Sequence, residues 1–127
     1  MSTIPISIHS SLIPIDVMRK TGVDVSLGCD GFYDSWSPFV PGDVMEKVYN
    51  FCDYTSKTSE RSLRESLGLI TGGVTPLSEN GEQQWPNVGK EASFVFLDAS
   101  CSAEAIARMP KSRELMHKGN LFKPLDE

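Results

Sequence analysis

The sequence predicts an α/β protein, because two strand-like segments flank a short helix near its start. Ile4 to Ile8 and Val23 to Gly28 each alternate apolar with polar or small residues, which is typical of strands. Pro14 to Thr21 predicts a helix, since Pro14 suits its first turn and Gly22 suits the position after its last. A strand, a helix and a strand in so few residues form a βαβ unit, so we expect the two strands to be parallel.

The length limits how much of any large fold the chain contains. Its 127 residues, of which 39% are hydrophobic and 23% charged, have an ordinary globular composition and suit one domain or less. A complete (β/α)8 barrel typically needs about 250 residues. A chain of this length is therefore too short to form a whole barrel by itself.

The charge and hydropathy of the sequence argue against nucleic acids and membranes as partners. The 12 basic residues are scattered and outnumbered by 17 acidic ones, which argues against nucleic-acid binding. No apolar stretch approaches the roughly 18 residues of a membrane span, and the N-terminus lacks the pattern of a signal peptide. Cys29, Cys52 and Cys101 form no CxxC pair, which suggests reduced thiols and a cytoplasmic location.

Downstream, the sequence predicts further helices and strands. Asp43 is a good N-cap for a helix over 44–52, and a second helix begins after Thr58 or Ser59 and ends at Gly72-Gly73. A polar loop over 78–90 follows. The remaining expected elements are a strand over 92–99, a helix over 103–108, and a hairpin pairing 113–116 with 121–122.

Asp30 is the first candidate functional residue, because it comes directly after the second predicted strand. Ligands of open α/β sheets and barrels gather at the carboxyl ends of the strands, where a carboxylate binds a metal or accepts a proton. The simpler alternative is that Asp30, followed by Gly31, only stabilises a turn through its own backbone. Spacing alone leaves both possibilities open.

Several motifs in order resemble one family. Val23 to Asp30, Asp34 to Phe39 and Gly42 to Met45 resemble the eighth barrel strand and following loop of the amidohydrolase superfamily. The most similar branch is cytosine deaminase and the related triazine-ring aminohydrolases. Val88 to Asp98 resembles a later strand of that branch, and Leu115 to Phe122 resembles its closing hairpin. The similarity extends over most of the chain.

The resemblance implies a place within a larger fold. It matches this chain to the C-terminal third of such an enzyme. Residues 1–77 are then the last two β/α units of a partial (β/α)8 barrel with their closing helices. Residues 78–127 are the C-terminal strands of a small β-sandwich.

The resemblance also implies chemistry. Such enzymes are hydrolases acting on carbon–nitrogen bonds of small cyclic amidine or amide substrates such as cytosine, and they depend on a divalent metal, zinc or iron. Asp30 matches the carboxylate that ligates the metal and shuttles protons. Trp36 matches an aromatic residue of the substrate pocket, and Asp34 is expected to order the same loop.

The chain departs from this pattern in ways that bear on activity. Gly31 stands where the branch usually has Asp or Asn, Val40-Pro41 lengthens the loop, Pro76 interrupts a helical segment, and Ser93 replaces an Asp. The histidine metal ligands have no counterpart here and would lie upstream of Met1. Catalytic zinc usually has three protein ligands, so we expect the isolated chain to be inactive.

Two further interpretations remain. A self-contained metal site would draw on Asp30 with His9, Cys29, Cys52 and Cys101, but their spacing fits no zinc pattern. Alternatively, the chain is a non-enzymatic remnant or interaction module that pairs with a companion chain or with itself. Exposed strand edges and apolar faces would favour such pairing.

Overall fold

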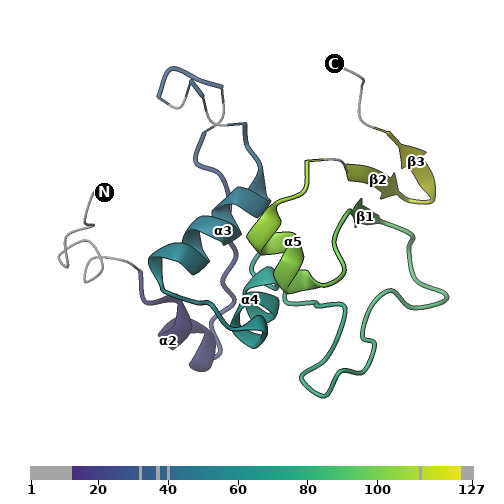
Figure 1. Cartoon of the computed structure of the whole chain (residues 1–127), viewed down its shortest axis with the longest axis horizontal. Helices are drawn as coiled ribbons and strands as arrows, with labels where there is room; N and C mark the ends of the chain where they lie inside the picture. Colours follow the sequence, from purple (N-terminus) through teal and green to yellow (C-terminus); the bar gives the residue numbers. More distant parts are fainter. Residues whose placement is uncertain (1–12, 32, 37, 40, 112, 124–127) are drawn as a thin grey trace.

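The structure is a computed structural model that describes residues 13–31, 33–36, 38–39, 41–111 and 113–123 (Figure 1). It is a mixed α and β structure in which the sheet stands to one side of the helices. The helices are α2 (Ile15–Lys20), α3 (Val44–Tyr54), α4 (Glu60–Leu67) and α5 (Ser102–Arg108). The strands are β1 (Phe94–Leu97), β2 (Arg113–His117) and β3 (Asn120–Phe122).

The helices begin where the sequence provides caps. The Asp43 carboxylate accepts a hydrogen bond from the Met45 N–H at the start of α3, and the Ser59 hydroxyl accepts one from the Ser62 N–H at the start of α4. Both caps were predicted and are confirmed. The predicted end of the second helix at Gly72-Gly73 is wrong. After Leu67 the backbone forms tighter bonds to residues three positions back, so α4 ends there and a series of turns follows.

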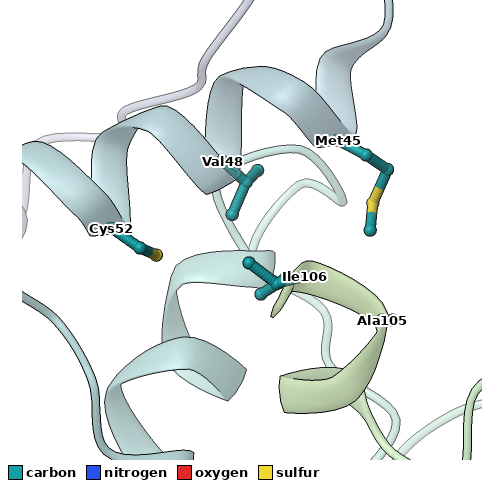
Figure 2. Packing of buried hydrophobic residues seen from close by; sticks show 5 residues of the cluster. All are labelled: Met45, Val48, Cys52, Ala105 and Ile106. Carbon is teal, nitrogen blue, oxygen red and sulfur yellow. The ribbon is translucent and has the colours of Figure 1, made fainter. Parts of the chain in front are cut away.

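The core is a small cluster between α3 and α5. Figure 2 shows Val48 and Cys52 of α3 pointing toward Ile106 of α5. Val48 is fully buried, and Ile106 is 1% exposed. The partly buried hydrophobic residues around the cluster are Leu27, Phe51, Leu63, Leu67, Ile70, Leu97 and Ala99.

The predicted strand over Val23 to Gly28 is wrong. That segment has no neighbouring strand in the described part of the chain, and its Leu27 N–H donates instead to the Leu69 carbonyl. The first predicted strand, Ile4 to Ile8, lies outside the described residues. The expected parallel pair is therefore not found among the residues that the structure describes, and the barrel and sandwich assignments stay predictions.

The described strands form one antiparallel sheet in the order β1-β2-β3. The predicted hairpin is confirmed, with Leu115 opposite Phe122 and Met116 opposite Leu121. Its turn residues, Lys118 and Gly119, have φ angles of 49° and 82°. Positive φ at both positions matches the twist of a two-residue hairpin. β1 is shorter than the predicted 92–99, because only Phe94 to Leu97 pair with β2.

Polar contacts fasten α2 to the later helices. Lys57 and Asp16 form an ion pair of 2.8 Å, and the Arg19 guanidinium donates to the Glu65 carbonyl at 3.3 Å. α2 confirms the helix predicted from Pro14 to Thr21. Within the described ranges, no helix is both long enough and apolar enough to cross a membrane.

Candidate functional site

The candidate site is the loop over residues 28–42, which we call the aromatic loop. Its first end is fixed at Leu27, whose N–H donates to the Leu69 carbonyl at 2.9 Å. The Leu27 side chain also packs against the core cluster, and Leu69 is 1% exposed. The loop therefore starts from a backbone position held against the turn that follows α4.

The other end is fixed by Asp43, the N-cap of α3. Two guanidinium nitrogens of Arg113 in β2 donate to the two Asp43 carboxylate oxygens at 3.0 and 2.9 Å. The hydrogen bond from Arg113, together with that from the Met45 N–H, holds the pKa of Asp43 below its usual value against the opposing effect of burial. The sequence analysis identified Asp43 only as a cap and missed Arg113.

Asp30 lies in the first part of the aromatic loop and is exposed. It follows an extended segment rather than a strand of a sheet. An exposed carboxylate so close to the fixed Leu27 backbone is accessible to a ligand and has a defined attachment to the core. By itself it offers two oxygen atoms, which suffice to accept a proton but not to enclose a metal ion.

Asp34 organises the middle of the loop. One of its carboxylate oxygens accepts a hydrogen bond from the Trp36 N–H at 3.1 Å, as in an Asx turn. A Cβ atom added to Gly31 would lie 2.3 Å from the other oxygen. A side chain at position 31 would therefore require the Asp34 carboxylate to move.

The described aromatic side chains of the loop project into solvent. Trp36 is 94% exposed, Phe39 is 92% exposed and Tyr33 is 69% exposed. The segment that leads into α3 extends away from the helices in Figure 1. At 94% exposure Trp36 contacts almost nothing, so its match to a pocket residue stays a prediction.

The described residues do not fit a complete metal site. No group of three or more His, Cys, Asp or Glu side chains that could hold a metal occurs among them. Cys29 is half-buried, Cys52 is in the core, and Cys101 is exposed. Burial raises the pKa of the Cys52 thiol, although Ser66 and Lys57 oppose the shift. His9 lies outside the described residues.

The described residues also form an open hollow where β1 leads into α5. It is lined by Leu97, Asp98, Ala99, Ser100, Glu104 and Arg108. Glu104 accepts hydrogen bonds from the Ser100 hydroxyl at 2.5 Å and from Arg108 at 2.8 Å. The Ser100 hydroxyl, first among several donors, lowers the pKa of Glu104. Ser100, Glu104 and Arg108 thus bond to one another in the lining of the hollow.

One curated relative shares extensive sequence with the chain. An uncharacterized protein of Escherichia coli (strain K12), YahJ, is 43% identical over 121 residues, which are 94% of this chain and 26% of YahJ. No family model matches the chain. The chain thus spans about a quarter of the length of this relative.

A solved structure shares the fold. The crystal structure of 5-methylcytosine deaminase from Klebsiella pneumoniae, liganded with 5-fluorocytosine, matches 91% of this chain with a TM-score of 0.67. The sequence identity is 17%, and the match covers 28% of the deaminase chain. The chain therefore has a fold similar to part of this deaminase, while the barrel and sandwich assignments stay predictions.

Proposed function

We propose that the chain forms the C-terminal third of a metal-dependent amidohydrolase that deaminates small heterocyclic substrates such as cytosine. The observation that carries this proposal is the fold match to part of a cytosine deaminase, together with the order of motifs around Asp30. In this proposal, residues 1–77 supply the last two β/α units of a barrel. Residues 78–127 supply strands of its sandwich, and the free cysteines suit a cytoplasmic protein.

Three residues of the aromatic loop have assigned roles. The Asp30 carboxylate would hold and transfer a proton, and it would contribute one ligand to a zinc or iron ion that activates water. Asp34 keeps the loop turned through its bond to the Trp36 N–H, and Trp36 packs against the substrate ring. The high exposure of Trp36 is consistent with a ring that another part of the enzyme covers.

The remaining metal ligands must come from outside the described residues. A lone carboxylate holds a catalytic metal weakly, since such sites usually have three protein ligands. We therefore propose that the chain is inactive by itself. Detectable cytosine deamination by the purified chain with added zinc or iron would contradict this part of the proposal.

A chimera tests the function directly. The segment of YahJ that matches this chain is replaced by the chain itself, and release of ammonia from cytosine and 5-methylcytosine is measured. The 43% identity over 121 residues makes correct packing of such a chimera a reasonable expectation. We expect deamination by the chimera.

A matched pair of variants identifies the role of Asp30. Asp30→Asn removes the charge and the proton acceptor while keeping the size, whereas Asp24→Asn makes the same change at an exposed position of the same extended segment. General acid–base groups typically contribute about 10²–10⁴-fold to rate. We expect a loss of at least that size for Asp30→Asn and little change for Asp24→Asn. Equal activity of the two folded variants would refute the assignment.

The alternative is an interaction module without catalysis. It is favoured by one observation: the described residues contain no group able to hold a metal, although large apolar side chains are exposed on the sheet. A folded chimera that binds metal and yet deaminates neither pyrimidine would support this alternative.

A further inference from the structure

The guanidinium of Arg113 in β2 is fixed through all three of its nitrogens. Its Nε donates to the Pro110 carbonyl at 2.7 Å, and its two terminal nitrogens donate to the two carboxylate oxygens of Asp43 at 3.0 and 2.9 Å. Both side chains are largely shielded from solvent. A planar guanidinium that bonds both oxygens of a carboxylate fixes its direction as well as its distance. Asp43 is therefore held in one orientation relative to the sheet.

The orientation of Asp43 affects the aromatic loop, because Asp43 is the residue directly after it. Gly42, the last residue of the loop, has a φ of 71°, a left-handed conformation that favours glycine. The backbone thus changes direction immediately before Asp43. The direction in which the loop extends from the start of α3 therefore depends on Arg113, although Arg113 lies in a distant strand.

The two ends of the aromatic loop are held by different parts of the chain. The first end follows Leu27, whose N–H donates to the Leu69 carbonyl, and Asp30 lies close to this end. Trp36 lies in the middle of the loop, so its position depends on both ends. Release of the second end should therefore displace Trp36 more than Asp30.

We propose that Arg113 is a positioning residue for substrate binding: through Asp43, it holds the aromatic loop so that Trp36 lies where the substrate ring packs. This inference rests on the proposed function, in which Trp36 contacts the ring and Asp30 transfers the proton. Arg113 itself touches neither the substrate nor the metal. Its removal should therefore weaken substrate binding more than it slows the chemical step.

The fluorescence of Trp36 tests the proposal in the chain itself. The chain contains two tryptophans, and Trp85→Phe leaves Trp36 as the reporter while keeping an aromatic ring against Phe94. In this background Arg113→Met removes the hydrogen bonds and keeps an apolar stem. Loops move on the nanosecond timescale that anisotropy decay detects. We expect Arg113→Met to increase the share of the Trp36 anisotropy that is lost through rapid local motion.

Arg61 provides the matched control. It also donates to two carboxylate oxygens, of Glu65 and Glu79, at 2.9 Å each, but its side chain is 66% exposed and joins α4 to the loop over 78–90. Arg61→Met should leave the Trp36 anisotropy unchanged. Circular dichroism verifies that the variants fold. Arg113→Lys keeps the charge but cannot bond both Asp43 oxygens and the Pro110 carbonyl, so its effect should be intermediate. If Arg113→Met does not fold, Arg113→Lys is compared with Arg61→Lys instead.

Kinetics of the YahJ chimera test the consequence for substrate binding. Loss of one aromatic contact in Trp36→Ala should raise the KM for cytosine by about fivefold. Arg113→Met should raise KM by a similar factor of about five and change kcat by less than about twofold. Because Arg113 acts through Trp36, the double variant should have the KM of Trp36→Ala alone.

Four results would overturn the proposal. These are an unchanged Trp36 anisotropy in Arg113→Met, equal effects of the Arg113 and Arg61 variants, a loss of kcat with KM unchanged, and KM effects that multiply in the double variant. A chimera that deaminates nothing, although Arg113→Met makes Trp36 more mobile in the chain, would support the control of the loop by Arg113 and count against the proposed function.

Discussion

Arg113 in β2 donates two hydrogen bonds, of 3.0 and 2.9 Å, to the carboxylate of Asp43, which lies 70 residues earlier in the sequence. The same carboxylate caps α3 by accepting a hydrogen bond from the Met45 N–H. One side chain therefore joins the end of the aromatic loop, the start of a core helix and the antiparallel sheet. Both partners are largely shielded, at 28% and 26% side-chain exposure.

Removing the Asp43 carboxylate should destabilise the chain. Asp43→Ala loses both the cap and the ion pair, and we expect a cost of about 2 kcal/mol in the free energy of unfolding. Asp43→Ser keeps a capping hydroxyl and should cost about 1 kcal/mol. Urea unfolding measures both values. Glu79→Ala removes the exposed partner of Arg61 and should change the stability by less than about 0.5 kcal/mol. Equal effects of Asp43→Ala and Glu79→Ala would show that the ion pair contributes nothing.

The free energy of unfolding should decrease as the pH is lowered, and part of that decrease should come from Asp43. Because the pKa of Asp43 in the folded chain lies below its value in the unfolded chain, the carboxylate contributes stability above the unfolded pKa of about 3.9. That contribution is lost as the pH falls through the folded pKa. Urea unfolding from pH 6 to pH 2.5 should therefore show a steeper loss for the wild-type chain than for Asp43→Asn. Parallel curves would contradict the assignment.

The cysteines should differ in reactivity. Cys52 is 4% exposed and burial raises the pKa of its thiol, so little thiolate forms and a reagent has no access to it. Cys101 is exposed. Mass spectrometry after brief iodoacetamide treatment at pH 8 should find Cys101 modified and Cys52 unmodified. Modification of both at similar rates in the native chain would mean that the α3–α5 core opens readily.

Truncation of the core should be costly. Ile106 is 1% exposed in the cluster between α3 and α5, and Ile106→Ala is expected to lower the free energy of unfolding by about 2–5 kcal/mol. Val88 is fully exposed, so Val88→Ala should change the free energy of unfolding by less than about 0.5 kcal/mol. Thermal and urea unfolding measure both. A loss below 1 kcal/mol at Ile106 would indicate a loosely packed core.

The correctly predicted elements are those marked by residues within the element itself or directly beside it. Asp43 followed by apolar residues at helical spacing marks α3, and Lys118-Gly119 between apolar pairs marks the hairpin. The strand prediction over Val23 to Gly28 was wrong because alternation of apolar and polar residues does not by itself make a strand. A strand also needs a neighbouring strand for its backbone, and two backbone N–H groups of this segment donate elsewhere, Val23 to the Met18 carbonyl and Leu27 to the Leu69 carbonyl.

Less of the candidate site than of the fold could be predicted from the sequence. Asp30 was singled out by its position directly after a predicted strand, and Asp34 and Trp36 were singled out through a family resemblance. The roles of all three stay proposals. Arg113 could not have been found, because nothing local to it indicates a partner 70 residues away. Long-range ion pairs of this kind depend on the assembled fold rather than on any short motif.

The metal content of the YahJ chimera tests the central claim most directly, namely that Asp30 belongs to a metal site completed by another part of the protein. Zinc and iron per chimera molecule are measured by mass spectrometry after dialysis. The account predicts about one metal ion for the unmodified and Asp24→Asn chimeras and a marked loss for Asp30→Asn. Equal metal content in all three, or no metal in the unmodified chimera, would contradict it.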